Sequence, residues 1–445
     1  MKKKSKIGFI SLGCPKNQVD TEVMLADVVK AGYEVTPEET EADIVIINTC
    51  AFIESAKQEA IDNILDEAWL KKNANLKGII VTGCLAQRYR EQVFEELPEV
   101  DALIGVGSLH KIVEAIEAVE RKRQYSSFED IAKMETACDR VVTTPDNLAY
   151  LKIAEGCDNR CTYCAIPLIR GKMRSRPIEQ IVEEAKDLER LGVKELNLSA
   201  QDTTRYGLDL YGEYRLAALV RAITEQTSIP WIRLLYCYPD KITDDLIAEL
   251  RDNPRLVKYM DIPVQHISDG VLKHMNRHGN GDTIREAIAR LRASVPGITL
   301  RTTVMVGFPG ETEKDFEELC AFVKETRFDR FGGFTFSPEE ETEAALLPNQ
   351  IEEEIKTERL DALMEIQLDI SAELQANKVG SEILVLAEGY DIPAGIHYGR
   401  SAADAPDVDG KIYFSAPKRI APGTFLRVKI TEALDYDLVG EAILD

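Results

Sequence analysis

The chain has 445 residues, which is more than one hydrophobic core ordinarily supports and predicts two or three domains. No apolar run approaches the ~20 residues of a membrane-spanning helix, and the apolar stretch near the N-terminus falls short of the ~7 to 15 residues of an export signal. The formal net charge of −23 argues against nucleic acid as a general partner and favours a basic one. Nine cysteines without an export signal indicate the reducing cytoplasm, where thiols bind metals or stay reduced.

Residues 4–120 alternate short apolar runs with amphipathic stretches, which predicts an N-terminal domain with a doubly wound parallel sheet. The expected strands are 7–12, 43–48 and 78–82, and the expected helices are 21–30, 55–66 and 87–97.

One cysteine follows each of these three strands: Cys14, Cys50 and Cys84. Ligands of an open α/β sheet bind beyond the carboxyl ends of its strands, so we expect the three thiols to converge there. Two alternatives are ordinary buried cysteines and a flavodoxin-like nucleotide site. The second is weaker, because no glycine-rich phosphate loop follows the first strand.

Residues 121–142 show no sustained period and are expected to form a connector, in which Cys138 has no predicted role. From residue 143 to 374 the alternation resumes, which predicts a partial (β/α)6 barrel with its chemistry at the carboxyl ends of the strands. Its six expected strands are 150–154, 195–199, 231–236, 258–262, 299–304 and 330–336.

A second set of cysteines, Cys157, Cys161 and Cys164, follows the first of these strands with the spacing Cys-x-x-x-Cys-x-x-Cys. Structural zinc sites normally have four ligands, whereas three thiolates on a four-iron cluster leave one iron open. A zinc site and unconnected buried cysteines are the alternatives. The motif resembles the signature of the radical S-adenosylmethionine (SAM) superfamily. That resemblance implies a [4Fe–4S] cluster whose open iron binds SAM and cleaves it to a 5′-deoxyadenosyl radical.

The two cysteine sets together resemble the radical SAM methylthiotransferases. Residues 11–20, Ser-Leu-Gly-Cys-Pro-Lys-Asn-Gln-Val-Asp, are similar to the branch that acts on the small-subunit ribosomal protein uS12. This resemblance implies a second [4Fe–4S] cluster on Cys14, Cys50 and Cys84. It also implies insertion of a methylthio group at the β-carbon of an aspartate of uS12, either free or in the small ribosomal subunit.

The same resemblance implies an electron donor such as flavodoxin or ferredoxin, a sulfur donor and no membrane partner. Two other functions compete with it: methylthiolation of a modified adenosine in tRNA, and a non-catalytic metal-binding scaffold. The scaffold would hold zinc or nothing and would form no deoxyadenosine.

Further SAM contacts are expected where later strands end, although each position is also compatible with ordinary turn chemistry. His274 and His278 have metal-like spacing but are expected on a surface helix, and Cys237 and Cys320 are expected to be core or bystander thiols. The candidate SAM contacts are Ser199, Gln201, Asp202, Gln265, Gly307 and Gly310, together with Arg174 in the basic segment 170–176, which is expected to contact an anion.

Residues 351–376 predict a long helix, and residues 377–444 contain short apolar runs that predict a small antiparallel β-barrel. This last domain resembles TRAM, commonly an RNA-binding module. Residues 378–445 carry seven Lys or Arg against eleven Asp or Glu, and Asp404, Asp407 and Asp409 lie in one loop. Since phosphate binding needs basic side chains, this composition favours a basic protein partner over RNA. The alternative is that these acids only keep the loop solvated.

Overall fold

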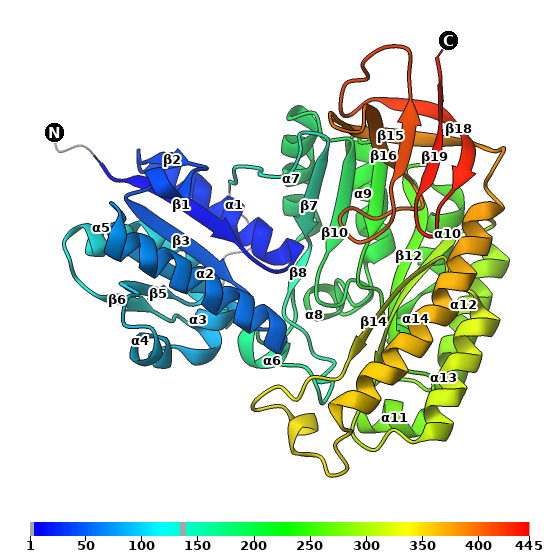
Figure 1. Ribbon diagram of the computed structural model, residues 1–445, viewed down its shortest axis with the longest axis horizontal. Coiled ribbons are helices and arrows are strands. Elements are labelled where there is room, and N and C mark those ends of the chain that lie inside the picture. The colour runs from blue at the N-terminus through cyan, green and yellow to red at the C-terminus, as the bar shows by residue number, and fades with distance from the viewer. Residues whose placement is uncertain (1–3, 134–138, 445) are drawn as a thin grey trace. The chain divides into compact units, whose positions relative to one another are not determined.

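The computed structural model describes residues 4–133 and 139–444, so Cys138 lies outside the described residues. The chain divides into two compact units (Figure 1). The first unit comprises Met1–Thr143, Lys152–Arg176 and Ser337–Ala345, and the second comprises Thr144–Leu151, Pro177–Phe336 and Leu346–Asp445.

The first unit is built on a parallel sheet with strand order β2-β1-β3-β4-β5-β6, which confirms the predicted doubly wound sheet. The order reverses at β1 and β3, and the crevice of such a sheet opens at that point. Edge strand β6 lies in the segment that was expected to be a connector. It was not predicted because three residues are too few to show a period. The strands are β1 Lys6–Ser11, β2 Glu34–Thr36, β3 Ile44–Thr49, β4 Gly78–Gly83, β5 Ala102–Ile104 and β6 Tyr125–Ser127.

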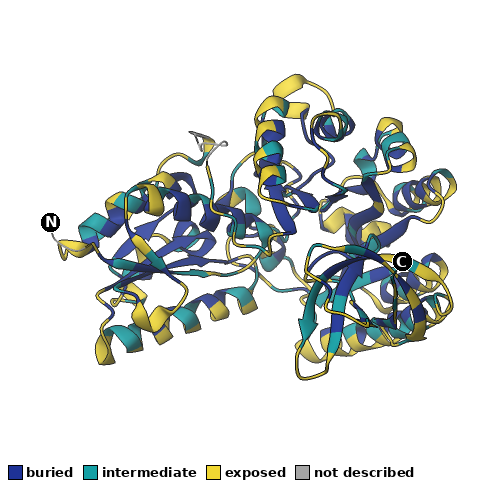
Figure 2. Cartoon of the chain, turned by 90° about the horizontal axis from the view of Figure 1, so that it is seen from above, coloured by how far each residue is buried: buried dark blue, intermediate teal, exposed yellow. Residues whose placement is uncertain are grey.

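Helices cover both faces of this sheet, so every residue of β3 and β4 is buried. Apolar residues of α1 and α5 pack on one face, and those of α2, α3 and α4 pack on the other. Burial is therefore concentrated on the strands, while outer helix faces are exposed (Figure 2). The helices are α1 Pro15–Lys30, α2 Glu54–Asn73, α3 Cys84–Tyr89, α4 Gln92–Glu96 and α5 Ile112–Glu120.

A returning segment of the chain, Lys152–Arg176, also belongs to the first unit, although the sequence placed it with the central domain. Its strands β8 (Ala154–Glu155) and β9 (Arg174–Ser175) pair antiparallel, and between them lie the second set of cysteines and α6 (Ile166–Ile169). Ala165 and Ile169 join the apolar cluster on the α2 face of the sheet.

The second unit contains the six-stranded sheet of the central domain, whose order β14-β13-β12-β11-β10-β7 follows the chain. This order confirms the predicted open barrel, and all six predicted strands are present. The strands are β7 Leu148–Lys152, β10 Glu195–Ser199, β11 Trp231–Leu234, β12 Leu256–Gln265, β13 Thr299–Val306 and β14 Arg330–Thr335.

Amphipathic helices connect these strands and bury their apolar faces, as α7 does with Ile181, Val182, Ala185 and Leu188. None of the described helices is long and apolar enough to cross a membrane. The helices are α7 Ile178–Arg190, α8 Leu208–Tyr211, α9 Leu216–Gln226, α10 Asp244–Asp252, α11 Asp269–His274, α12 Gly281–Ser294, α13 Glu313–Thr326 and the long α14 Glu353–Ala376.

The C-terminal strands form a closed five-stranded barrel around a core that includes Val385, Phe414 and Val428. Neighbouring strands are antiparallel, as predicted, except that β17 and β19 pair in parallel. The strands are β15 Glu382–Asp391, β16 Ile396–Ser401, β17 Ile412–Ser415, β18 Phe425–Ala433 and β19 Leu438–Ile443.

This barrel docks at the amino ends of the central strands. Trp231, the first residue of β11, contacts Phe425 with ring centroids 4.9 Å apart. Asp404 pairs with Arg330, the first residue of β14, and both side chains are buried. Chemistry in such a sheet is expected at the opposite, carboxyl ends of the strands.

The acidic loop of the C-terminal barrel is therefore not the free acidic surface that the sequence suggested. Asp404 binds Arg330, while Asp409 accepts a hydrogen bond from Tyr259 at 2.7 Å and lies 3.5 Å from Arg301. Of the three aspartates only Asp407 is exposed. The prediction that this loop favours a basic partner was wrong for Asp404 and Asp409, because their cations belong to the same chain.

Candidate functional site

The structure places each N-terminal cysteine at the carboxyl end of a strand. Cys14 precedes the first turn of α1, Cys50 follows β3, and Cys84 is the first residue of α3, directly after β4. The strands β1 and β3 are the pair at which the sheet order reverses. The three thiols therefore meet where an open α/β sheet binds its ligands.

Two glycines allow these three turns to come close together. Gly13 has φ of +88°, and a Cβ there would lie 2.7 Å from the Cβ of Cys50. Gly83 has φ of +90°, and a Cβ there would lie 2.5 Å from the carbonyl oxygen of Thr49. A side chain at either position would push a cysteine turn away from Cys50.

The thiols also influence one another electrostatically. Burial, together with the nearby Cys84 and Cys14, raises the pKa of Cys50 to about 12, while Arg170 opposes this shift. Burial likewise raises the pKa of Cys84 against the opposing effect of Arg170. Adjacent thiols of this kind lose their protons when they bind a metal.

A cluster on this donor set stays a prediction. Among the described residues, no three His, Cys, Asp or Glu side chains gather closely enough to hold one metal ion. The sulfur ligands of a four-iron cluster stand farther apart, because each binds a different iron atom. The three thiols follow three neighbouring strands, β1, β3 and β4.

The second set of cysteines lies on the loop between β8 and β9. Cys157 and Cys161 are buried and Cys164 is half-buried. The backbone N–H of Cys157 donates to the carbonyl of Gly171 at 3.0 Å, and the N–H of Cys164 donates to the carbonyl of Cys161 at 3.0 Å. Three thiols on one short, internally bonded loop are again an incomplete ligand set, which suits a cluster with an open iron.

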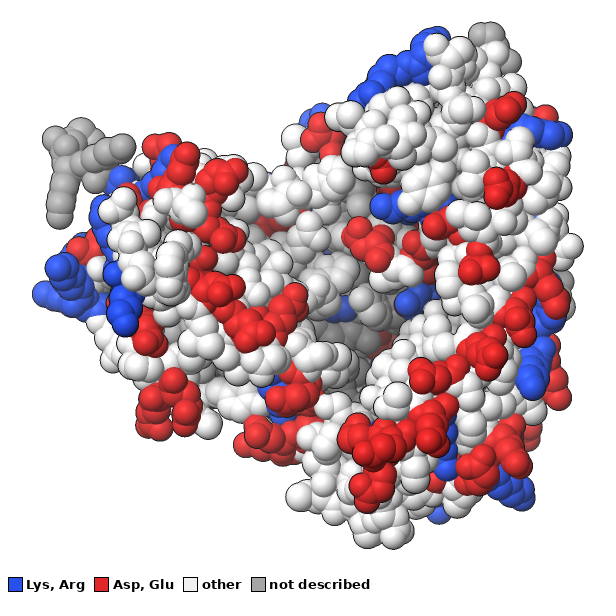
Figure 3. All heavy atoms as spheres, viewed as in Figure 1, with Lys and Arg blue, Asp and Glu red and all other residues white. Residues whose placement is uncertain are grey.

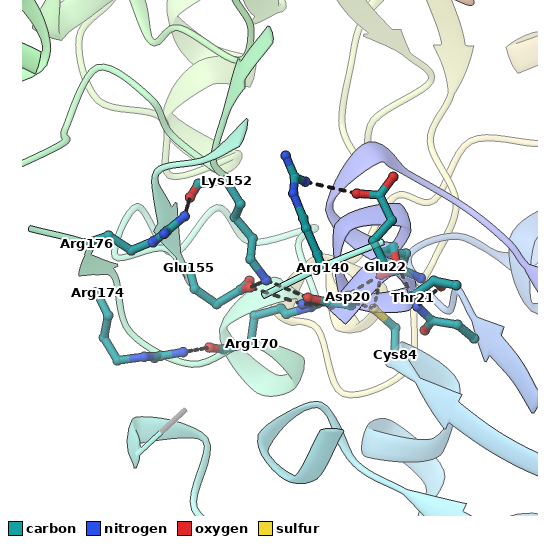
Figure 4. Close-up of polar contacts among 12 residues, drawn as sticks. Asp20, Thr21, Glu22, Cys84, Arg140, Lys152, Glu155, Arg170, Arg174 and Arg176 are labelled. Atoms are coloured by element: carbon teal, nitrogen blue, oxygen red, sulfur yellow. Dashed lines mark hydrogen bonds and ion pairs between the residues drawn. The ribbon is translucent and has the colours of Figure 1, made fainter. Parts of the chain in front are cut away.

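Four buried charged residues join this segment to the N-terminal domain within the first unit; we call them the ion quartet (Figure 4). They are Asp20 of α1, Lys152 of β7, Glu155 of β8 and Arg170 after α6. Lys152 Nζ lies 2.5 Å from Asp20 and 2.8 Å from Glu155, and Arg170 Nη1 lies 2.7 Å and 3.1 Å from the same carboxylates. The charges of the quartet balance, which makes their burial tolerable.

Arg170 also reaches the N-terminal cysteines. Its Nη2 donates to Asn17 Oδ1 at 2.6 Å and to Cys84 Sγ at 3.6 Å. No pattern in the sequence indicated this role, although Asn17 and Asp20 lie in the stretch that carries the family resemblance. The expectation that segment 170–176 contacts an anionic ligand was wrong for Arg170, whose anions are Asp20 and Glu155.

The remaining predicted SAM contacts in the first unit and at the strand ends of the second unit have varied surroundings. Arg174 donates to the carbonyl oxygens of Lys172 at 2.6 Å and Arg170 at 3.1 Å. Asp202 is buried and accepts a hydrogen bond from Thr204 at 2.7 Å. Gln201 follows β10 next to it. Their contact with SAM stays a prediction.

Ser199 and Gln265 are better candidates on structural grounds. Ser199 is the last residue of β10 and Gln265 the last of β12. Both are buried, and within the described residues neither Ser199 Oγ nor Gln265 Oε1 has a hydrogen-bond partner. Gln265 also has φ of +69°, which is uncommon outside glycine. Buried polar atoms of this kind are normally satisfied, so they fit a polar ligand at the carboxyl ends of the strands.

The two predicted glycines after β13 differ from each other. A Cβ at Gly307 would lie 2.2 Å from Cγ of Lys356, so packing against α14 already explains that glycine. Gly310 has φ of +82° and open space around it. The turn is held by Glu311, which accepts the N–H of Gly307 at 2.8 Å.

The remaining cysteines and the two histidines were expected to take no part in the chemistry. Cys237 is fully buried and Cys320 is half-buried on α13. Both histidines are exposed, but His274 is the last residue of α11. The expectation of a surface helix was therefore wrong for His278, which lies beyond the end of α11.

Family models match three segments of the chain. The Radical SAM superfamily matches residues 151–323, the Uncharacterized protein family UPF0004 matches residues 6–105, and the TRAM domain matches residues 379–443. The chain is 49% identical over 436 residues to a protein of Thermoanaerobacter sp. (strain X514) named ribosomal protein uS12 methylthiotransferase RimO, with 98% of this chain and 99% of the relative covered. A protein of the same name from Geobacter sulfurreducens is 47% identical, with 99% of each chain covered.

The chain belongs to the uS12 methylthiotransferase family. Membership makes it a radical SAM enzyme, and that superfamily implies SAM and a [4Fe–4S] cluster. Cys157, Cys161 and Cys164 lie inside the segment that matches the superfamily, and their role as ligands of this cluster stays a prediction.

Solved structures agree with this methylthiotransferase at the level of the fold. The radical SAM methyltransferase TsrM from Kitasatospora setae, solved with cobalamin and a [4Fe–4S] cluster, has a TM-score of 0.57 at 14% identity, with 77% of each chain covered. The cobalamin-dependent radical SAM enzyme OxsB has a TM-score of 0.51 at 14% identity, with 82% of this chain and 56% of that chain covered.

Proposed function

We propose that this enzyme inserts a methylthio group at the β-carbon of an aspartate in ribosomal protein uS12, using two [4Fe–4S] clusters. The observation that carries the proposal is the presence, within one compact unit, of two separate three-cysteine sets. A single radical SAM cluster needs only one of them. The N-terminal set, at the ligand-binding edge of its own sheet, is available for a second cluster that carries sulfur.

In this proposal Cys157, Cys161 and Cys164 hold the first cluster, and Cys14, Cys50 and Cys84 hold the second. When bound, the first cluster and SAM would supply a 5′-deoxyadenosyl radical, the second cluster would supply the sulfur, and a second SAM would supply the methyl group. A carbon–hydrogen bond of this kind is beyond side-chain acids and bases, which is why cofactors must supply the step. The chain holds and shields the clusters, and the groups that would orient SAM are Ser199, Gln201, Asp202, Gln265, Gly307, Gly310 and Arg174.

The partners follow from the same chemistry. Besides this chain, the reaction needs a low-potential electron donor of the flavodoxin or ferredoxin class and a donor of sulfur. The cytoplasm contains both donors and uS12. Acidic side chains spread widely over the face of the molecule in Figure 3, in keeping with the net charge of −23. This charge suits a basic ribosomal protein better than RNA.

The radical step is tested with Cys161→Ala. We expect anaerobically reconstituted wild-type enzyme, given SAM and a reductant, to form 5′-deoxyadenosine, and the variant to form none. Cys320→Ala, which changes a half-buried cysteine of α13, is the control and should retain the activity. Formation of 5′-deoxyadenosine by Cys161→Ala at the wild-type rate would contradict the assignment of the first set.

The second cluster is tested by iron and sulfide content. Wild-type protein should bind about eight irons, and a variant with Cys14, Cys50 and Cys84 all changed to Ala should bind about four, as two four-iron clusters require. Four irons in both proteins would remove the second cluster and the sulfur-transfer proposal with it.

The substrate is tested with purified uS12 and with tRNA under the same conditions. We expect a mass increase of one methylthio group on an aspartate of uS12 and no modification of tRNA. Modification of an adenosine in tRNA, with uS12 unchanged, would contradict the proposal.

A further inference from the structure

One hydrogen-bond donor of the ion quartet, Nη2 of Arg170, is not needed to pair the two carboxylates. Two cations already balance two carboxylates, and each carboxylate is contacted by both Lys152 and Arg170. Arg170 nevertheless extends its second terminal nitrogen, Nη2, away from the quartet to Cys84 Sγ at 3.6 Å. A planar guanidinium can divide its donors in this way, whereas an ammonium group acts as a single point charge.

The surroundings fix this donor in place. Arg170 Nη1 is held by Asp20 at 2.7 Å and by Glu155 at 3.1 Å. Nη2 also donates to Asn17 Oδ1 at 2.6 Å. The amide of Asn17 is itself oriented, because its Nδ2 donates to the carbonyls of Leu12 at 3.1 Å and Thr49 at 2.9 Å.

The same short segment touches both sets of cysteines. Arg170 contacts Cys84 through its side chain, and the next residue, Gly171, accepts the backbone N–H of Cys157 at 3.0 Å. Glu155, which holds Arg170, lies two residues before Cys157 on the strand that leads into the second set. A substitution of Arg170 therefore removes a direct contact with one of the N-terminal cysteines, Cys84.

We propose that Arg170 is a positioning residue for the N-terminal cluster, donating a hydrogen bond to the Cys84 sulfur and raising the reduction potential of that cluster. The inference rests on the proposed function, since it requires a cluster on Cys14, Cys50 and Cys84. One-electron reduction adds a negative charge to the cluster, and a fixed cationic N–H donor at a ligand sulfur stabilises the reduced form. Asp20, Glu155 and Asn17 keep that donor aimed at the sulfur.

The test isolates the N-terminal cluster by changing Cys157, Cys161 and Cys164 to Ala. In this background the reduction potential is measured by an anaerobic titration with dithionite, which gives up the electron and is oxidised, and reduction is followed by electron paramagnetic resonance. We expect Arg170→Gln to keep about four irons and to shift the potential to lower values.

Lys152→Gln is the matched control. It removes one positive charge from the same quartet, but Lys152 donates to the two carboxylates rather than to a sulfur. A shift clearly smaller than that of Arg170→Gln supports the hydrogen bond to Cys84. Equal shifts in the two variants, or no shift in Arg170→Gln, would overturn the proposal.

Arg170→Lys answers the question if Arg170→Gln does not fold, as judged by circular dichroism. It keeps the charge but not the divided donors, so we expect about four irons with a lowered potential, and an unchanged potential would overturn the inference. If the background protein with Arg170 intact binds no iron, the proposed N-terminal cluster itself is wrong. If it binds iron and the potential ignores Arg170, only the present inference is wrong.

Discussion

At the scale of single residues, the loop that carries the second set of cysteines depends on a glycine. Gly156 has φ of +80°, and a Cβ there would lie 2.1 Å from the carbonyl oxygen of Lys172 and 2.6 Å from that of Gly171. These are backbone atoms of the segment just before β9, so they cannot rotate away. The close approach aligns Cys157 with its hydrogen-bond acceptor on Gly171.

We therefore expect Gly156→Ala to lower the free energy of unfolding by about 1–3 kcal/mol more than a control and to reduce the bound iron from about eight to about four. The control is Gly192→Ala, which has φ of +98° but open space around the added Cβ. Urea unfolding and iron analysis measure the two effects. Equal losses in both variants would show that φ alone, and not the contact with residues 171 and 172, sets the effect.

At the scale of secondary-structure elements, α2 contains a buried carboxyl that destabilises the folded protein when it is ionised. Glu67 is 1% exposed, and its Oε2 has no hydrogen-bond partner within the described part of the chain. Burial, together with the neighbouring Glu39, raises the pKa of Glu67 to about 7 from its ordinary 4.5. Between these two values the folded protein holds more protons than the unfolded chain, so stability falls as the pH rises through that window.

Glu67→Gln should thus raise the free energy of unfolding by about 1–3 kcal/mol at pH 8, where the wild-type carboxyl is ionised in both states. The gain should shrink as the pH falls toward 4.5, because the wild-type side chain is then neutral when folded. Glu59→Gln, on the exposed face of the same helix, is the control and should have little effect. An equal gain at pH 5 and pH 8 would mean that ionisation is not the cause.

At the scale of the whole molecule, buried ion pairs attach the C-terminal barrel to the amino ends of the central strands. Arg400 of β16 lies 2.7 Å from Glu195, and Glu195 lies 2.7 Å from Arg233. Asp404 pairs with Arg330 in the same second unit. The free-energy cost of burying such a pair is small while both partners are present. Removing one partner leaves the other charge buried without a counter-ion.

Asp404→Ala should consequently lower the free energy of unfolding of the second unit by about 3–5 kcal/mol, because Arg330 is left buried without its carboxylate. Glu382→Ala is the control, since its pair with Arg427 at 3.4 Å is exposed and such pairs contribute about 0–1 kcal/mol. Urea unfolding of both variants gives the comparison. If the two losses were alike, the docking of the barrel would not depend on this pair.

The sequence by itself determined all six strands of the central sheet and the positions of the two sets of cysteines, whereas the short strands β2, β5 and β6 were not predicted. The predicted strand 195–199 coincides with β10, because an apolar run bounded by turn residues is a local property. Cys14, Cys50 and Cys84 could be placed together because parallel strands end at a common edge. The family resemblance at residues 11–20 followed from residue identities alone.

Only the tertiary structure decided which charges pair. Arg170 and Asp20 are 150 residues apart, and Arg330 and Asp404 are 74 apart. The sequence does not distinguish a charged loop residue that is solvated by water from one that forms an ion pair with a distant residue. Packing alone removes the water and selects the partner. For this reason the sequence suggested a ligand contact for Arg170 and a surface for a basic partner at Asp404, until the fold placed each beside its counter-ion.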